Sequence, residues 1–118
     1  MISRQHRFHG LNSLRTVYKY GQTVRNPQIA LKYNLNPKRQ TYRCAVVVAK
    51  KVEKSAVKRN RIRRRVFEIV RSVEPAITQP YDLVFSIYSA DVVDMPFTKV
   101  ETSIKQLLKN ASVLDSVK

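Results

Sequence analysis

The densest group of chemically active side chains lies between Lys50 and Arg71, and its chemistry is the binding of negative charge. Ten of the chain's 23 Lys and Arg residues fall in this segment, against two acids, Glu53 and Glu68. Arginine predominates, and its planar fork of N–H donors matches two phosphate oxygens at once. Like charges at such density destabilise a protein unless a counter-charge arrives. The segment therefore predicts a polyanion-binding surface; the alternative is a helix face that is merely solvated.

Residues that could catalyse a reaction do not gather anywhere in the sequence. The chain has two glycines, too few for a Gly-rich phosphate loop. Its acids are scattered, whereas a two-metal nuclease needs clustered carboxylates. His6 and His9 lack partners at metal-ligand spacing, and Cys44 lies in an apolar run where burial is expected to leave it inert. We therefore expect no catalytic residue and no metal site in the protein.

The charge is distributed unevenly along the chain. Its net value is +15, and residues 1–71 hold 19 basic and two acidic residues, whereas residues 72–118 hold four basic and six acidic. Such an asymmetry indicates a nucleic acid or an anionic membrane as the partner. No apolar run reaches the roughly 18 to 20 residues that span a bilayer, and the N-terminus lacks the apolar core of a signal peptide. We expect a cytoplasmic protein without a membrane partner.

The basic segment is also the best helix candidate. Ile62, Val66, Ile69 and Val73 recur at helical spacing and predict an amphipathic helix from residue 54 or 55 to 73. Arg59 projects near the apolar stripe, at the start of the helix. The outward-facing residues are expected to be Asn60, Arg64, Glu68 and Arg71, flanked by Arg61 and Arg65 on one side and by Arg63 on the other.

The remaining elements follow from periodicity and turn residues. We expect a first helix at 11–20 ended by Gly21, a short extended piece before Asn26-Pro27, and a strand over Ile29–Leu35. The apolar run 41–49 predicts a central strand, buried on both faces and paired antiparallel with the strand before it. A strand at 81–88 and a helix at 96–108 complete the chain.

This order, α-β-β-β-α-β-α, predicts a single α+β domain over residues 1–118. The strand 41–49, the basic helix and the strand 81–88 form a βαβ crossover if the two strands are parallel neighbours. Residues 113–118 are expected to fray.

Aromatic residues beside cations favour RNA or single strands over duplex DNA, because exposed rings stack on unpaired bases. The adjacent pairs are Arg7-Phe8, Tyr18-Lys19, Lys32-Tyr33 and Tyr42-Arg43. The alternative is that Tyr18 and Tyr33 belong to the core. No helix-turn-helix or zinc-finger spacing occurs.

The segment 46–71 resembles the protein subunit of bacterial ribonuclease P. The family has a strand ending in Lys-Lys, then an Ala, then an Arg-Asn motif on a helix. The matching residues here are Val48-Ala49-Lys50-Lys51, Ala56 and Arg59-Asn60-Arg61-Ile62-Arg63-Arg64. Arg7-Phe8, Val17–Gly21 and Tyr81–Val84 also resemble family segments, so that the similarity spans roughly residues 4–112.

The resemblance implies a two-layer α/β sandwich with a four-stranded sheet and a left-handed βαβ crossover, like the second domain of ribosomal protein S5. It implies a protein that does not cut RNA itself. A catalytic RNA, with Mg²⁺ held at that RNA, removes the 5′ leader of precursor tRNA endonucleolytically. One protein would bind each ribonuclease P RNA and also contact the leader.

Carried over by the resemblance, the residues that bind the RNA subunit are Lys50, Lys51, Lys54, Arg59, Asn60, Arg61, Arg63 and Arg64. Those that line the leader cleft, between the first helix and the sheet, are Arg7, Phe8, Leu14, Tyr18, Lys32 and Tyr33. Three positions depart from the family pattern: Leu14 replaces a Phe, Arg65 an apolar residue and Phe67 an Arg.

Two other functions remain as alternatives, of which the first shares the charge and the fold class. A structural RNA-binding protein, for instance of the ribosome, would co-purify with ribosomal particles. A DNA-binding regulator that inserts the basic helix into a major groove would show sequence preference on duplex DNA.

Overall fold

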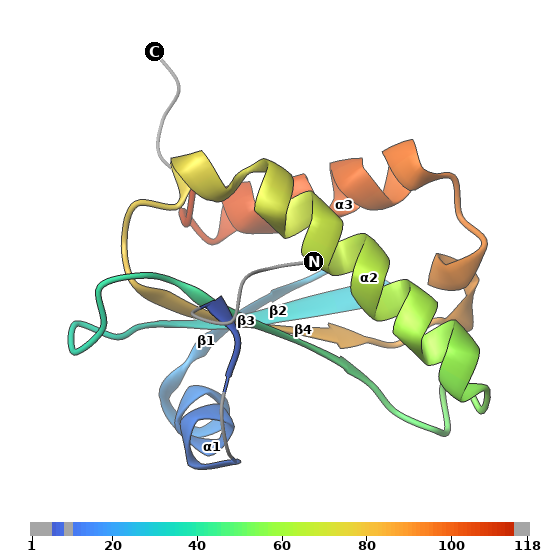
Figure 1. The fold of residues 1–118 in the computed structure, drawn as a ribbon, viewed down its shortest axis with the longest axis horizontal. Coiled ribbons are helices and arrows are strands. Elements are labelled where there is room, and N and C mark those ends of the chain that lie inside the picture. Colours follow the sequence, from blue (N-terminus) through green and yellow to red (C-terminus); the bar gives the residue numbers. More distant parts are fainter. Residues whose placement is uncertain (1–5, 9–10, 115–118) are drawn as a thin grey trace.

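The computed structural model describes residues 6–8 and 11–114 of the chain, except for the side chains of residues 11–13 (Figure 1). Two short 3-10 helices, η2 (Glu74–Ala76) and η3 (Ala90–Val93), accompany the main elements. The main elements are α1 (Leu11–Tyr20), β1 (Gln22–Arg25), β2 (Ile29–Leu35), β3 (Arg43–Val48), α2 (Ala56–Ser72), β4 (Tyr81–Ile87) and α3 (Phe97–Asn110). The predicted order of helices and strands is confirmed.

The four strands form one mixed sheet in the order β1-β2-β4-β3. β4 pairs antiparallel with β2 and parallel with β3. The predicted hairpin between β2 and the run 41–49 is therefore wrong, and so is the central position of that run: β3 lies at the edge, where Val47 is 36% exposed. The inner strands are β2 and β4, and in β4 Leu83, Val84 and Phe85 are all fully buried.

The helices divide between the two faces of the sheet (Figure 1). α2 and α3 lie together on one face, and α1 lies on the other. The β3–α2–β4 unit is the expected crossover between parallel neighbours. In Figure 1 both strands run towards the same side with β3 in front of β4 and α2 above them, which makes the crossover left-handed.

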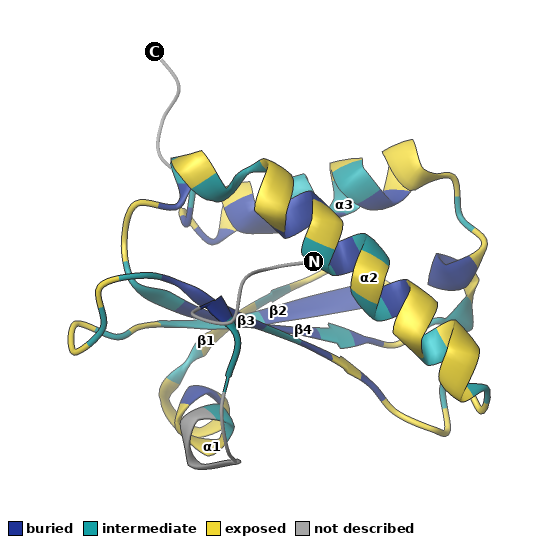
Figure 2. Ribbon diagram, in the orientation of Figure 1, coloured by how far each residue is buried: buried dark blue, intermediate teal, exposed yellow. Residues whose placement is uncertain are grey.

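The core lies between the sheet and the pair α2 and α3. Figure 2 shows the buried stripe of α2 facing the sheet and its exposed side facing outward. Ile62, Val66 and Ile69 are fully buried, as their spacing predicts. The core also includes Val113, which is 1% exposed, so it reaches beyond residue 112 into the segment that we expected to fray. Residues 115–118 lie outside the described part of the chain.

Gly21 sets the angle at which α1 meets the sheet. Its N–H donates to the Val17 carbonyl at 2.8 Å, which closes the helix at the predicted residue. A Cβ at this position would lie 2.5 Å from the carbonyl oxygen of Val17 and 2.9 Å from that of Tyr33. Only glycine therefore allows the end of α1 to approach β2 this closely.

Candidate nucleic-acid interface

Ser55 fixes the start of the basic helix. Its hydroxyl accepts a hydrogen bond from the Lys58 amide at 3.2 Å, as an N-cap residue does. The Glu53 carboxylate accepts from the Ser55 amide at 3.0 Å. One of the two acids of the basic segment thus stabilises the turn before α2, and within the described part of the chain it forms no ion pair with the arginines of the helix.

The five arginines between residues 59 and 65 divide into two groups. Arg59 donates through Nη1 to the carbonyls of Glu53 and Lys54, both at 2.9 Å. Arg65 donates to the carbonyls of Val92 and Met95, at 2.8 and 2.6 Å. These two guanidinium groups therefore hold α2 to the preceding loop and to the η3 segment.

The other three arginines face outward. Arg61 and Arg64 are exposed, and neither makes a hydrogen bond or ion pair with any residue that the structure describes. Arg63 is half-buried and donates to the Asn60 side-chain oxygen at 2.7 Å, which orients that amide. We call the basic ridge the set of outward-facing residues Lys50, Lys51, Lys54, Asn60, Arg61, Arg63 and Arg64.

A hollow of about 250 Å³ lies within the basic ridge, lined by Asn60, Arg63, Arg64 and Phe67. These residues recur at i, i+3, i+4 and i+7 and share one flank of α2. The half-buried Phe67 packs against the core and forms the floor of a cationic groove. A hollow of this kind suits one phosphate or one base edge.

A second surface lies on the face of the sheet that carries α1. The strand register aligns Lys32 of β2 with Val84 of β4, which in turn pairs with Ala45 of β3. The next set of paired residues on this face, one step further along β3, includes Val47, which is exposed. This face therefore combines apolar residues with Ser86, and it carries a cation, Lys32, on one side.

Two aromatic–cation pairs flank this surface. The Lys32 Nζ lies 5.9 Å from the centroid of the exposed Tyr18 ring, on the α1 side. The guanidinium carbon of Arg43 lies 4.5 Å from the centroid of the Phe8 ring, near β3. Leu14 is half-buried on α1, and Arg7 is half-exposed beside Phe8. The structure thus brings Phe8, Tyr18 and Lys32 to one face of the sheet, and we call this the α1 face.

Tyr33 is the exception among the residues predicted for the leader cleft. It alternates with Lys32 along β2, so its side chain lies on the opposite face, packed against the core. Its hydroxyl donates to the Gln22 side chain at 2.9 Å. Placing Tyr33 in the same cleft as Tyr18 and Lys32 is therefore wrong, because adjacent residues of a strand point to opposite faces.

An ion pair that the sequence did not predict completes the α1 face. Arg43 is 8% exposed and forms a buried ion pair with Asp82, whose Oδ1 lies 2.8 Å from Nε. Asn36 donates to the other carboxylate oxygen at 3.2 Å. A cavity of about 400 Å³ opens beside this pair and extends to Thr16 on α1. Arg43 and Asp82 lie 39 positions apart in sequence. Only the parallel pairing of β3 with β4 therefore reveals their ion pair.

Other features bear on what the protein can do. Cys44 is buried, as predicted, and burial raises the pKa of its thiol far above the usual range, so that it stays protonated and unreactive. Across residues 6–8 and 11–114, His, Cys, Asp and Glu nowhere gather in threes that could hold a metal ion. His9 lies outside the described residues. None of the described helices is long and apolar enough to cross a membrane.

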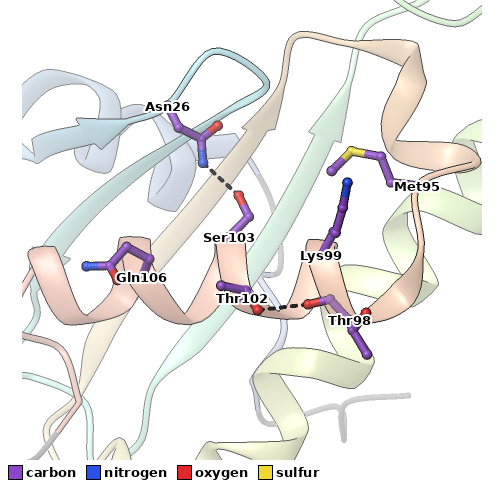
Figure 3. A pocket seen from close by; sticks show the side chains of 7 residues that line it. All are labelled: Asn26, Met95, Thr98, Lys99, Thr102, Ser103 and Gln106. Carbon is purple, nitrogen blue, oxygen red and sulfur yellow. Dashed lines mark hydrogen bonds between the residues drawn. The ribbon is translucent and has the colours of Figure 1, made fainter.

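A further hollow, of about 530 Å³, lies along α3 near the β1–β2 turn (Figure 3). The Asn26 side chain donates to the Ser103 hydroxyl at 2.7 Å and ties this turn to α3. Lys99 is the one charged residue among those that line the hollow. Its lining is otherwise neutral, so it does not extend the cationic interface.

The amino-acid sequence is similar to a single family of proteins. Residues 2–112 match the family model described as Ribonuclease P. The Ribonuclease P protein component of Chloroflexus aurantiacus is 40% identical over 114 residues, which cover 96% of this chain and 82% of that protein. The corresponding protein of Clostridioides difficile is 35% identical over 103 residues, 86% of this chain and 88% of that one.

A solved structure agrees with the sequence matches. The RNase P protein of Staphylococcus aureus superposes with a TM-score of 0.83 at 25% identity, over 93% of this chain and 98% of that chain. The similarity thus extends from the sequence to the arrangement of helices and strands.

Proposed function

This chain belongs to the ribonuclease P protein family, and from that membership we propose that it binds the catalytic RNA of ribonuclease P and the 5′ leader of precursor tRNA. In this role it assists the endonucleolytic removal of the leader, which generates the mature 5′ end of tRNA. The observation that carries the proposal is the match of residues 2–112 to the family model, together with the outward-facing cations of α2.

The basic ridge is the proposed contact with the RNA subunit. Lys50, Lys51 and Lys54 precede α2 and are exposed, and Arg61 and Arg64 continue the same cationic surface along the helix. Crowded RNA phosphates repel one another, and a cationic surface releases the counterions condensed on them. Arg59 contributes by holding the loop that carries Lys54, since it donates to the carbonyl of that residue.

The α1 face is the proposed contact with the leader. A single-stranded leader presents unpaired bases, which stack on aromatic rings, and phosphates, which cations neutralise. Phe8 and Tyr18 offer the rings, and Lys32 and Arg7 the cations. The exposed Val47 of β3 lies on the same face and offers apolar contact. Leu14, where the family commonly has Phe, offers apolar contact without stacking.

We propose that the protein contributes no cutting group. The reaction would be carried by the RNA subunit, and Mg²⁺ would be held there, because the cationic ridge repels a divalent metal ion. One protein would act with each RNA, in the cytoplasm. What the protein supplies is positive charge and a fixed path for the leader.

Reconstitution with a bacterial ribonuclease P RNA tests this function. At low Mg²⁺, where the RNA alone is slow, the protein is expected to raise precursor-tRNA cleavage and to increase the preference for precursor over mature tRNA. The protein by itself should not cleave. Absence of stimulation would refute the proposal; co-purification with ribosomal particles, or sequence-specific binding to duplex DNA, would favour the corresponding alternative.

A further inference from the structure

The N-terminal segment passes from one face of the sheet to the other around the edge of β3. In Figure 1 residues 6–8, in dark blue, descend past the edge of the sheet in the direction of α1. His6 lies on the α2 side, beside Tyr42, and Phe8 lies on the α1 side, over Arg43. Between them, the backbone of Arg7 forms a parallel bridge with Cys44. The position of Phe8 therefore depends on what holds this segment to the edge strand.

His6 makes the closest set of contacts in this segment. It is 7% exposed, and its ring stacks on that of Tyr42, with centroids 4.1 Å apart and planes inclined by 10°. Its Nδ1 lies 3.0 Å from the carbonyl oxygen of Tyr42. Because a carbonyl only accepts, Nδ1 carries the proton and donates it. The ring is thereby held at its face and at one edge.

The Glu74 carboxylate lies at the other edge of the ring. Its Oε1 lies 3.5 Å from the His6 Nε2, and the same oxygen accepts the Tyr42 hydroxyl at 2.5 Å. Burial and this carboxylate raise the pKa of Tyr42, so its hydroxyl remains a donor throughout the pH range in which proteins are studied. Tyr42, Glu74 and His6 thus form one connected cluster, which joins the start of β3, the η2 helix and the N-terminal segment.

We propose that His6 is a positioning residue for the leader, which fixes the N-terminal segment so that the Phe8 ring stands beside Arg43. The inference rests on the proposed function, because it concerns how the α1 face receives the leader. Arg43 is itself fixed by Asp82, so the ring meets a cation that does not move. His6 does not touch the leader in this arrangement, since it lies on the other face of the sheet. It acts through Phe8.

A ring that is fixed before binding loses less conformational entropy when a base stacks on it. Without the His6 contacts, the described part of this segment would keep the Arg7 backbone bridge and the contact of Phe8 with Arg43, and ordering its backbone would cost more of the binding free energy. Stacking on one base is worth roughly five- to a hundredfold in affinity. We therefore expect His6→Ala to reduce the preference for leader-bearing over leaderless tRNA about tenfold.

The experiment compares four reconstituted holoenzymes: wild type, His6→Ala, Phe8→Ala and the double variant. Each is assayed for affinity to precursor tRNA and to mature tRNA without a leader. The expected result is that either single substitution lowers the preference for the leader, and that the double variant is no worse than Phe8→Ala. Affinity of the protein for the RNA subunit, which depends on the basic ridge, should stay within about twofold of the wild type.

Each outcome separates the two ideas. If the wild-type holoenzyme shows no preference for the leader, the proposed function fails. If the wild type shows it and His6→Ala retains it, the inference is overturned while the function stands. Additive losses in the double variant would also overturn it, because they mean that His6 acts independently of Phe8. A general loss of folding in His6→Ala would appear as weaker binding to the RNA subunit. In that case Tyr42→Phe serves as the milder variant, because it keeps the stacking and removes the hydroxyl. It should lower the leader preference without weakening the binding to the RNA subunit.

Discussion

Helices α2 and α3 lie on the same face of the sheet and pack against each other, yet their outer surfaces differ in kind (Figure 1). On the outer side of α3 polar groups satisfy one another: Glu101 lies 3.5 Å from Lys105, and Gln106 donates to Asn110 at 2.9 Å. On α2, Arg61 and Arg64 have no such partner among the described residues. The inner stripe of a helix determines where it packs, and its unpaired outer charges indicate what it binds.

The largest expected effect comes from placing a charge in either inner stripe, where the two helices should behave alike. Ile62→Asp on α2 and Ile104→Asp on α3 each put a carboxylate at a site with no exposure. Burying an unpaired charge costs several kcal/mol, comparable to the total stability of a small domain. Circular dichroism is expected to show loss of the cooperative thermal transition in both variants.

Thr102→Asp is the matched control, because it introduces the same group on the exposed side of α3. It should change the free energy of unfolding by no more than about 0.5 kcal/mol. A cooperative transition retained by Ile62→Asp would mean that α2 does not pack through the stripe described above.

The next effect separates the two groups of arginines within α2. Arg65→Ala leaves the carbonyls of Val92 and Met95 without their donor, so the protein should lose about 1–3 kcal/mol of stability. Arg61→Ala removes the same side chain from an exposed position on the same helix and should leave stability unchanged. Urea denaturation measures both. Equal effects would show that the Arg65 hydrogen bonds do not stabilise the η3 segment.

The order of strands could not be predicted from the sequence, although the elements themselves could. Helical spacing and turn residues identified every main helix and strand, because these signals are local. Strand neighbours depend on contacts distant in sequence, and here the buried run of β4 competes with that of β3 for the centre of the sheet. Val47 showed no sign of exposure in the sequence, because an edge strand of valines has the same pattern as a central one.

The candidate site shows the same division between local and distant information. The cations of the basic ridge were predictable from composition and from the family resemblance. Whether an arginine binds a partner or a backbone carbonyl was not, because Arg65 reaches carbonyls 27 and 30 positions away. These contacts give a role to Arg65, at a position where the family resemblance led us to expect an apolar residue: the half-buried side chain binds the carbonyls of Val92 and Met95. The contacts of Arg43 with Asp82 and of His6 with Glu74 were not predicted for the same reason.

A smaller effect tests the outer surfaces directly. Arg64→Ala on α2 removes an exposed cation from the ridge and should weaken binding to the ribonuclease P RNA about fivefold. The slope of log affinity against log salt should fall by about one, and the melting temperature should hardly change. Lys99→Ala on α3 removes an equally exposed cation and should leave RNA affinity within about twofold. Filter binding over a salt series measures both variants.

If Arg64→Ala destabilises the fold and leaves RNA affinity intact, the assignment of outward and inward faces on α2 is wrong. If Lys99→Ala weakens binding as much as Arg64→Ala, RNA responds to the total charge of the protein, and the difference between the helices has no functional meaning.

The smallest expected effect is an increase in RNA affinity. Glu68 is the acid on the exposed side of α2, 3.9 Å from Arg71, and Glu101 is its counterpart on α3. The first pair is exposed and the second is half-exposed, so Glu68→Gln and Glu101→Gln should each cost less than about 0.5 kcal/mol of stability. Their effects on RNA should differ. Glu68→Gln removes a negative charge beside the phosphates and should tighten binding about twofold at low salt, less at high salt. Glu101→Gln, on the other helix, should not change it. Weaker RNA binding by Glu68→Gln would mean that this carboxylate orients Arg71 for the RNA, so that an acid belongs to the ridge as a positioning group.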